Sequence, residues 1–316
     1  MTSHHRSGRP EIGTSVDRAL EVIGNGGLVA LPTETVYGLA ADADDERAVR
    51  SVFATKGRPA DHPLIVHVAE AGLLGEWASE IPDSAAVLAE TCWPGPLTLL
   101  VPRAARVLDV VTGGRPTVGV RVPAHPLATA LLTRFRASGG SGGLAAPSAN
   151  RFGRVSPTTA AHVAADLGDA VDYVLDGGPC PVGVESTIVD CTVEPAQVLR
   201  PGGISAEQVA ALLGTDGVAP EASGPSRAPG MLASHYAPDA QVVLVSSGDE
   251  ALRLADATPG SVIVDHGADL ASYARSLYAD LRAADLSGAT TIIAVLPPAE
   301  GLGHAVRDRL VKAAHR

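Results

Sequence analysis

Hydrophobic residues follow two alternating spacings from the N-terminus of this chain to about residue 213. Apolar residues three and four positions apart predict amphipathic helices, here after an N-cap at Thr14 or Ser15, after an N-cap at Asp44, and over 83–91, 126–136, 158–167 and 205–213. Short apolar runs between Gly and Pro turns predict strands over 28–31, 64–68, 97–101, 118–122, 143–146, 171–175, 187–190 and 197–199. Because several strands follow one another without a helix between them, the pattern favours an α/β domain whose twisted mixed sheet is flanked by helices.

The regular spacing stops after residue 213, where the chain becomes rich in Pro, Gly and Ser. Such a composition is typical of a linker, which we place at 214–238. Beyond it, strands predicted at 242–245, 261–264 and 291–295 alternate with helices at 249–256, 270–284 and 303–314. We therefore expect a first domain over 10–213 and a small parallel βαβαβα domain over 239–316.

Composition narrows the possible partners of the chain. Its net charge of −11 opposes the generic electrostatic attraction to nucleic acids, so any anion site must be local. The three cysteines form no C-x-x-C pair, so neither a disulfide framework nor a zinc site is indicated. No signal peptide and no apolar run of membrane-spanning length are apparent, and we expect a cytoplasmic protein without a membrane partner.

Lys56 is the first candidate for chemistry. It is one of only two lysines among 24 Lys and Arg residues, and it lies in the stretch F-A-T-K-G-R-P-A-D-H-P-L. Lysine offers a compact point charge that arginine does not replace where an ammonium approaches phosphate oxygens. A cation that stabilises the C-terminus of a helix would explain the same residue, and both interpretations stay open.

Four cations lie at turns or strand ends of this acidic chain: Lys56, Arg58, Arg121 and Arg200. Hydroxyl and amide side chains of Thr117, Ser148, Asn150 and Ser186 occur in the same kinds of position. Each of these stretches also has an ordinary explanation in turn-forming and capping residues. Together they predict a cationic, hydroxyl-rich pocket for a phosphate-bearing ligand, although no P-loop, kinase loop or Rossmann fingerprint is present.

The same segments, in this order, resemble the Sua5/YrdC/YciO family. The resemblance covers about residues 15–205 through P-T-E-T-V-Y-G-L, K-G-R-P, H-P-L, P-G-P-L-T, V-R-V-P, P-S-A-N, S-P-T-T-A, E-S-T-I-V-D and L-R-P-G. It continues through P-G-M-L-A-S-H-Y-A-P at 229–238 into the last domain. It implies a YrdC-like catalytic domain and a Rossmann-like C-terminal Sua5 domain.

The resemblance also implies an activity. Family members of this kind are nucleotidyltransferases that convert L-threonine, bicarbonate and ATP into L-threonylcarbamoyladenylate and pyrophosphate, for the t6A modification of tRNA. Mg²⁺ would arrive with ATP, and no metal ligated by the protein alone is expected. The partner that follows would be the machinery that transfers the threonylcarbamoyl group to tRNA.

Site residues carry over motif by motif as implications of the resemblance. The expected threonine ligands are Thr35, His67, Arg121, Ala146 and Ser186. The expected ATP ligands are Lys56, Arg58, His62, Thr117, Ser148, Asn150, Arg200 and Tyr236, with Lys56 and Arg58 also in a catalytic role. The linker would pass over the active site as a lid.

The chain departs from the family pattern at two places. His62 stands where the family loop K-x-R-P-x-x-N-P-L carries asparagine, and an imidazole still offers one donor or acceptor to a nucleotide. Leu232-Ala233 stands before His235 where a basic residue is usual, which predicts weaker contact between linker and phosphate.

Two other functions are compatible with a domain of this family. One is an RNA-binding module, which the acidic charge and the 3% aromatic content disfavour. The other is a hydrogenase-maturation carbamoyltransferase, whose zinc-finger cysteines and acylphosphatase segment the chain lacks.

Overall fold

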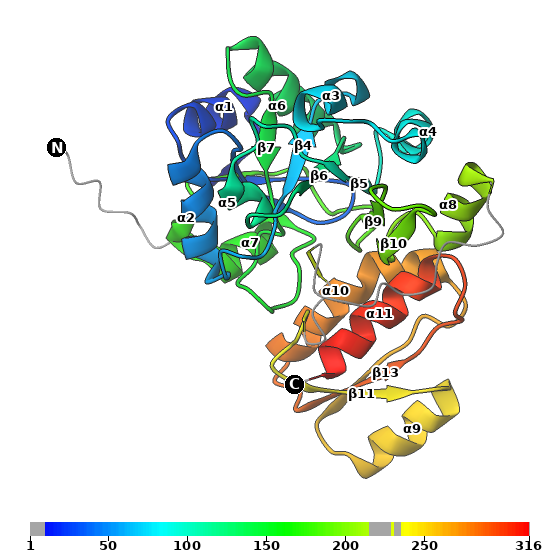
Figure 1. The fold of residues 1–316 in the computed structure, drawn as a ribbon. Helices are drawn as coiled ribbons and strands as arrows, with labels where there is room; N and C mark the ends of the chain where they lie inside the picture. Colours follow the sequence, from blue (N-terminus) through cyan, green and yellow to red (C-terminus); the bar gives the residue numbers. More distant parts are fainter. Residues whose placement is uncertain (1–9, 215–228, 231–234, 316) are drawn as a thin grey trace.

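The structure is a computed structural model that describes residues 10–214, 229–230 and 235–315 (Figure 1). Most of the predicted linker, including Leu232-Ala233, lies outside the described residues. None of the described helices has both the length and the apolar character needed to cross a bilayer.

A ten-stranded mixed sheet forms the centre of the first domain, and two strands in it were not predicted. The strands, in their order across the sheet, are β1 (Glu11–Gly13), β8 (Tyr173–Leu175), β2 (Val29–Leu31), β3 (Gly38–Asp42), β7 (Gly143–Ala145), β4 (Ile65–Val68), β6 (Thr117–Arg121), β5 (Leu97–Pro102), β9 (Thr187–Asp190) and β10 (Gln197–Arg200). Parallel pairs such as β4–β6 lie beside antiparallel pairs such as β5–β6, which confirms the predicted mixed sheet. The additional strands are β1 and β3. The sequence did not predict them because their three to five small or exposed residues give no clear apolar alternation.

Helices cover both faces of this sheet. They are α1 (Val16–Gly24), α2 (Glu46–Lys56), α3 (Leu74–Trp77), α4 (Asp83–Cys92), α5 (Asp109–Thr112), α6 (Pro126–Ala137), α7 (Ala160–Leu167) and α8 (Ala206–Leu213), with 3₁₀ turns at Ala71–Leu73 and Gly168–Ala170. Successive residues of a strand point to opposite faces. Accordingly Val29 packs with α1 and α6, whereas Ala30 packs with the core that contains α2 and α4.

The start and end of α2 set the position of Lys56 and of the loop that follows it. Asp45, and not the predicted Asp44, caps the helix, because its carboxylate accepts a hydrogen bond from the Ala48 amide at 3.1 Å. The helix continues through Lys56 and ends at Gly57, which has a left-handed φ of 63°. Lys56 is therefore the last helical residue, and the loop begins only after it.

The second domain contains a three-stranded parallel sheet, as predicted. The central strand β13 (Thr291–Val295) pairs with β11 (Gln241–Val245) on one side and β12 (Ser261–Val264) on the other. Helix α9 (Gly248–Ala257) lies on its outer face, and α10 (Leu270–Leu286) and α11 (Leu302–Ala314) lie between this sheet and the first domain (Figure 1).

The two domains share a hydrophobic core. Val36 and Val184 of the first domain pack into one cluster with Tyr273, Leu277 and Tyr278 of α10. The same contact contains a bidentate ion pair between Arg282 of α10 and Asp166 of α7. The face of the first domain that carries its polar strand ends is consequently covered by α10 and α11.

Candidate active site

One pocket collects residues from at least six separate segments of the chain. Its walls are residues that follow β2, α2 and β7 or precede β9, the last residues of β6 and β10, and part of β4 and of the linker. The lining residues are Thr33, Thr35, Val36, Gly38, Arg58, Ile65, His67, Arg121, Ala146, Pro147, Ser148, Glu185, Ser186, Arg200, Pro229, Gly230, His235 and Tyr236. All five predicted threonine ligands are among them, as are Arg58, Ser148, Arg200 and Tyr236 of the predicted ATP ligands.

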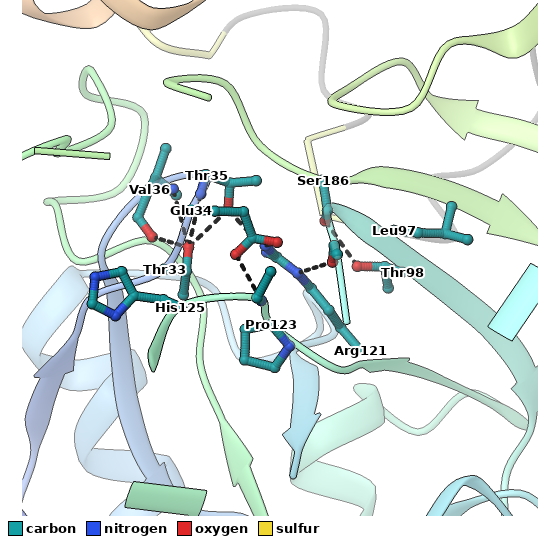
Figure 2. A network of polar contacts seen from close by, with 12 residues as sticks. Thr33, Glu34, Thr35, Val36, Leu97, Thr98, Arg121, Pro123, His125 and Ser186 are labelled. Atoms are coloured by element: carbon teal, nitrogen blue, oxygen red, sulfur yellow. Dashed lines mark hydrogen bonds and ion pairs between the residues drawn. The ribbon is translucent and has the colours of Figure 1, made fainter. Parts of the chain in front are cut away.

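Arg121 lies at the centre of a buried polar network (Figure 2). Its Nη1 donates to Thr35 Oγ1 at 2.9 Å and its Nε donates to the Gly95 carbonyl at 3.2 Å. Its Nη2 lies 2.8 Å from Glu34 Oε1, an ion pair in which both side chains are less than one-tenth exposed. The contact lacks good hydrogen-bond geometry, since neither atom has a hydrogen-bond partner, and the pair is held chiefly by charge.

Backbone donors and hydroxyls fix the loop that carries Glu34. Glu34 Oε2 accepts a hydrogen bond from the Ala124 amide at 3.2 Å. Thr33 Oγ1 donates to the Val36 carbonyl at 2.6 Å and lies 2.8 Å from Thr35 Oγ1 (Figure 2). Hydroxyl groups that bond to nearby backbone stabilise tight turns, so the turn after β2 presents Thr35 to Arg121 in a fixed orientation.

His67 is a neutral group on the pocket wall. It lies on β4 directly opposite Arg121 of β6. Burial and the Arg121 charge lower the pKa of His67 to about 3, so its imidazole carries no charge at neutral pH. Its Nδ1 is buried without a hydrogen-bond partner, and a ligand atom could supply one.

Arg58 and Arg200 bring further positive charge to the pocket. Arg58 Nη2 donates to the Pro63 carbonyl at 3.0 Å, while its Nε has no partner. Burial and the nearby Arg200 guanidinium lower the pKa of Arg58 to about 10, so Arg58 remains charged at neutral pH. Arg200 donates to the Ser186 carbonyl from Nε at 3.0 Å and to Ser186 Oγ from Nη2 at 3.0 Å. Two like charges held close together favour an anionic ligand between them.

Lys56 takes a different position from the one its rarity suggested. Its ammonium is 2.5 Å from both the Ser148 and the Asn150 carbonyl oxygens, and it is not among the lining residues. Burial and the Arg58 charge lower its pKa well below the usual value. Lys56 thus fixes the backbone of the P-S-A-N segment from outside the pocket lining. Its contact with a ligand stays a prediction.

Three further predicted ATP ligands lie outside the lining. Asn150 is buried and donates from Nδ2 to the Arg151 and Arg154 carbonyls, which leaves its Oδ1 without a partner. His62 lies with its ring edge-on to Phe152, 5.4 Å between centroids. Thr117 begins β6, four residues before Arg121, which is about 13 Å along an extended strand. Their assignment to ATP stays a prediction.

Four residues in the described part of the linker line the pocket: Pro229, Gly230, His235 and Tyr236. Tyr236 is 1% exposed and has a φ of 62°, an uncommon conformation for a bulky residue that points to a functional constraint. Gly230 has a φ of 82°, and a Cβ there would lie 2.8 Å from Tyr236 Oη. Only glycine allows this close approach.

Several lining residues were not predicted, among them Thr33, Glu185, Pro229, Gly230 and His235. Glu34, which pairs with Arg121 behind this lining, was not predicted as a site residue either. Glu34 directly precedes Thr35 and Glu185 directly precedes Ser186, so both carboxylates lie inside motifs that contain a predicted ligand. This position was the only sign in the sequence that they belong to the site. Within the described ranges, no three His, Cys, Asp or Glu side chains gather as metal ligands would.

Two protein-family models match this chain. The family model described as "Telomere recombination", for Sua5, YciO and YrdC, matches residues 21–202, which is more than half of the chain. The chain belongs to the Sua5/YrdC/YciO family. A second model, described as the C-terminal domain of threonylcarbamoyl-AMP synthase, matches residues 204–315.

Full-length relatives of the family agree with this assignment. The threonylcarbamoyl-AMP synthase of Pyrococcus abyssi is 42% identical over 92% of this chain and 91% of its own length. That of Bacillus subtilis is 39% identical over 91% of this chain and 89% of its own length. The crystal structure of Pyrococcus abyssi Sua5 complexed with L-threonine covers 97% of both chains at 38% identity, with a TM-score of 0.88. The chain is therefore an enzyme of this family.

Proposed function

We propose that this enzyme makes L-threonylcarbamoyladenylate from L-threonine, bicarbonate and ATP and releases pyrophosphate. The observation that supports this most directly is the meeting of Arg58, Arg121 and Arg200 in one pocket with uncharged polar groups of Thr35, His67 and Ser186. Such a pocket suits a carboxylate and a polyphosphate side by side. The first product would then serve the t6A modification of tRNA, through a separate transfer machinery.

The reaction requires positioning more than an activated protein nucleophile. The threonine amine adds to bicarbonate, water leaves, and the resulting carbamate carries the nucleophilic oxygen. That oxygen attacks the α-phosphorus of ATP as the bond from this phosphorus to the β-bridging oxygen breaks, and pyrophosphate departs with the electron pair. Bringing two anions together calls for fixed positive charge around both, which Arg58 and Arg200 supply.

Threonine is assigned to the wall built by β4 and β6. Arg121 holds the substrate carboxylate, and neutral His67 offers Nδ1 to a polar atom of the same ligand. Ala146 shapes the space for the side-chain methyl group, while Thr35 and Ser186 provide hydroxyls. Burial of all five residues strengthens these contacts, because the local dielectric is low.

ATP is assigned to the side that carries Arg58, Ser148, Arg200 and Tyr236. Mg²⁺ enters as part of the Mg-ATP substrate and is bound by phosphate oxygens. For Lys56 the carbonyl contacts favour a positioning role through Ser148 and Asn150. Segment 214–238 acts as a lid that excludes water from the labile carbamate and mixed anhydride.

A pyrophosphate-release assay with each substrate omitted in turn tests this function. Release must require L-threonine, Mg-ATP and bicarbonate together, and mass spectrometry must identify the adenylate. Arg121→Ala should raise the threonine concentration required for half-maximal rate, while Arg50→Ala, a matched change at an exposed surface arginine, should not. Equal release without bicarbonate would refute the proposal.

A further inference from the structure

Arg309 is a fully buried arginine that belongs to the second domain but makes most of its contacts outside that domain. It lies on α11 with its side chain 0% exposed. Its Nε donates to Glu185 Oε2 at 2.8 Å, and its Nη2 donates to the Pro201 carbonyl at 3.0 Å. Its guanidinium lies 5.1 Å from the ring centroid of Tyr236, and its Nη1 pairs with Asp308. A buried charge with this many partners outside its own domain serves the interface and not the domain core.

The two first-domain contacts of Arg309 flank two pocket residues. Glu185 directly precedes Ser186, and Pro201 directly follows Arg200. Ser186 and Arg200 are themselves joined, since Arg200 Nε and Nη2 donate to the Ser186 carbonyl at 3.0 and 2.8 Å. Arg309 therefore bridges the backbone segments that carry a proposed threonine ligand and a proposed ATP ligand.

Glu185 is the centre of this bridge. Its carboxylate accepts hydrogen bonds from Ser156 Oγ at 2.6 Å and Tyr278 Oη at 2.7 Å, besides that from Arg309. Burial alone would raise its pKa, but the charges of Arg309 and Arg200 lower the pKa to about 2. Tyr236 and His235 of the linker are the other titratable groups near it. A carboxylate buried among so few cations depends on each of them.

The next turn of α11 contacts the linker. Lys312 Nζ donates to the Gly230 carbonyl at 2.6 Å, and Asp308 pairs with Lys312 at 2.7 Å as well as with Arg309. Arg200 Nη1 donates to the neighbouring Pro229 carbonyl at 3.1 Å. One face of α11 thus contacts both the inner wall of the pocket and the segment that covers it.

We propose that Arg309 is a positioning residue of the active site: through Glu185 and Pro201 it sets the spacing of Ser186 and Arg200, and so couples the C-terminal domain to the binding of threonine and ATP. This inference rests on the proposed function for its kinetic readout. It gives the second domain a specific task, which is to supply from α11 the cation that completes the pocket. Without α11, the Glu185 carboxylate would lack Arg309, the cation that contacts it most closely.

The test compares Arg309→Met with Arg282→Met. Arg282 is the control because it also joins the domains, from a partly buried position, through its bidentate pair with Asp166. Neither Arg282 nor Asp166 lines the pocket. Both variants should lower the melting temperature. Arg309→Met should reduce kcat/KM for threonine by about 100-fold, the size of loss that follows when reacting groups are misplaced by about 1 Å. Arg282→Met should stay near the wild-type value.

A second readout separates positioning from general destabilisation. Without Arg309 the pKa of Glu185 rises, so the loss in Arg309→Met should be larger at high pH, where the unpaired carboxylate is charged, and smaller at low pH. The double variant Arg309→Met/Glu185→Gln should lose this pH slope and recover part of the activity. Arg309→Lys keeps the positive charge but lacks a second donor nitrogen for the Pro201 carbonyl. It takes the place of Arg309→Met if that variant does not fold, and its kcat/KM should lie between those of the wild type and the double variant.

The outcomes are distinct. Equal kcat/KM for Arg309→Met and Arg282→Met in folded protein, or a pH slope that persists in the double variant, would overturn the inference. Absence of bicarbonate-dependent pyrophosphate release from the wild-type protein would overturn the proposed function instead.

Discussion

The pair of Arg121 and Glu34 allows a test in which protein stability can be restored without restoring substrate binding. Arg121→Met removes a guanidinium that is 5% exposed and leaves the Glu34 carboxylate, 9% exposed, without its cation 2.8 Å away. At about 4 Å between charge centres and an effective dielectric of about 20, the lost attraction is about 4 kcal/mol. This agrees with the cost of about 3–5 kcal/mol for breaking a buried ion pair by removing one partner. Arg121→Met should therefore unfold at a temperature about 10 °C lower than the wild type.

The double variant Arg121→Met/Glu34→Gln removes both charges. A neutral amide can still accept a hydrogen bond from the Ala124 amide, as Glu34 does at 3.2 Å. Replacing a buried ion pair by neutral groups of similar volume is often close to neutral in stability. The double variant should therefore regain most of the melting temperature lost by Arg121→Met.

Threonine binding should not return with the stability. In the proposed function Arg121 binds the substrate carboxylate, and neither variant retains a cation at that position. Calorimetric titration with L-threonine, and the KM in the pyrophosphate assay, should show weak binding in both variants. Two results would refute the reasoning: a double variant as unstable as Arg121→Met, or one that binds threonine as the wild type does.

Three further predictions concern Gly202, Gly230 and Glu185. Gly202→Ala should abolish activity and lower the melting temperature, because its Cβ would lie 2.3 Å from the Glu185 carbonyl oxygen; normal activity would contradict this. Gly230→Ala should reduce kcat/KM in a protein that is otherwise folded, because φ is 82° and the new methyl group would meet Tyr236, and steady-state kinetics measures this. Since the folded pKa of Glu185 is about 2 and its ordinary value is 4.5, its contribution is present above about pH 4.5 and is lost as the pH falls toward 2. Urea unfolding across that range should show a loss on the order of 3 kcal/mol that Glu185→Gln removes.

Sequence reasoning found the threonine side of the pocket more completely than the ATP side. Thr35, His67, Arg121, Ala146 and Ser186 all line the pocket, because each lies in or beside a short strand whose end faces the same edge of the sheet. Side-chain alternation and strand ends are local properties that a sequence reveals. Their roles as ligands remain predictions.

Lys56 and Thr117 show where local reasoning stopped. The rarity of lysine marked Lys56, but its ammonium contacts carbonyl groups 92 and 94 residues further along the chain. Thr117 and Arg121 share one face of β6, yet four residues of extended chain separate them. A shared face gives direction and not distance, so it did not decide which of the two lines the pocket.

By itself the sequence determined the elements and the chemical character of the site: helices and strands from apolar spacing, two folded parts around a Pro- and Gly-rich segment, and a few cations at turns of an acidic chain. Only the tertiary structure decided which charges are paired. Glu34 meets Arg121 across 87 residues of chain, and Glu185 meets Arg309 across 124. The physical reason is that spacing along the chain fixes local backbone geometry, whereas the partner of a buried charge depends on which distant surfaces pack together and exclude water.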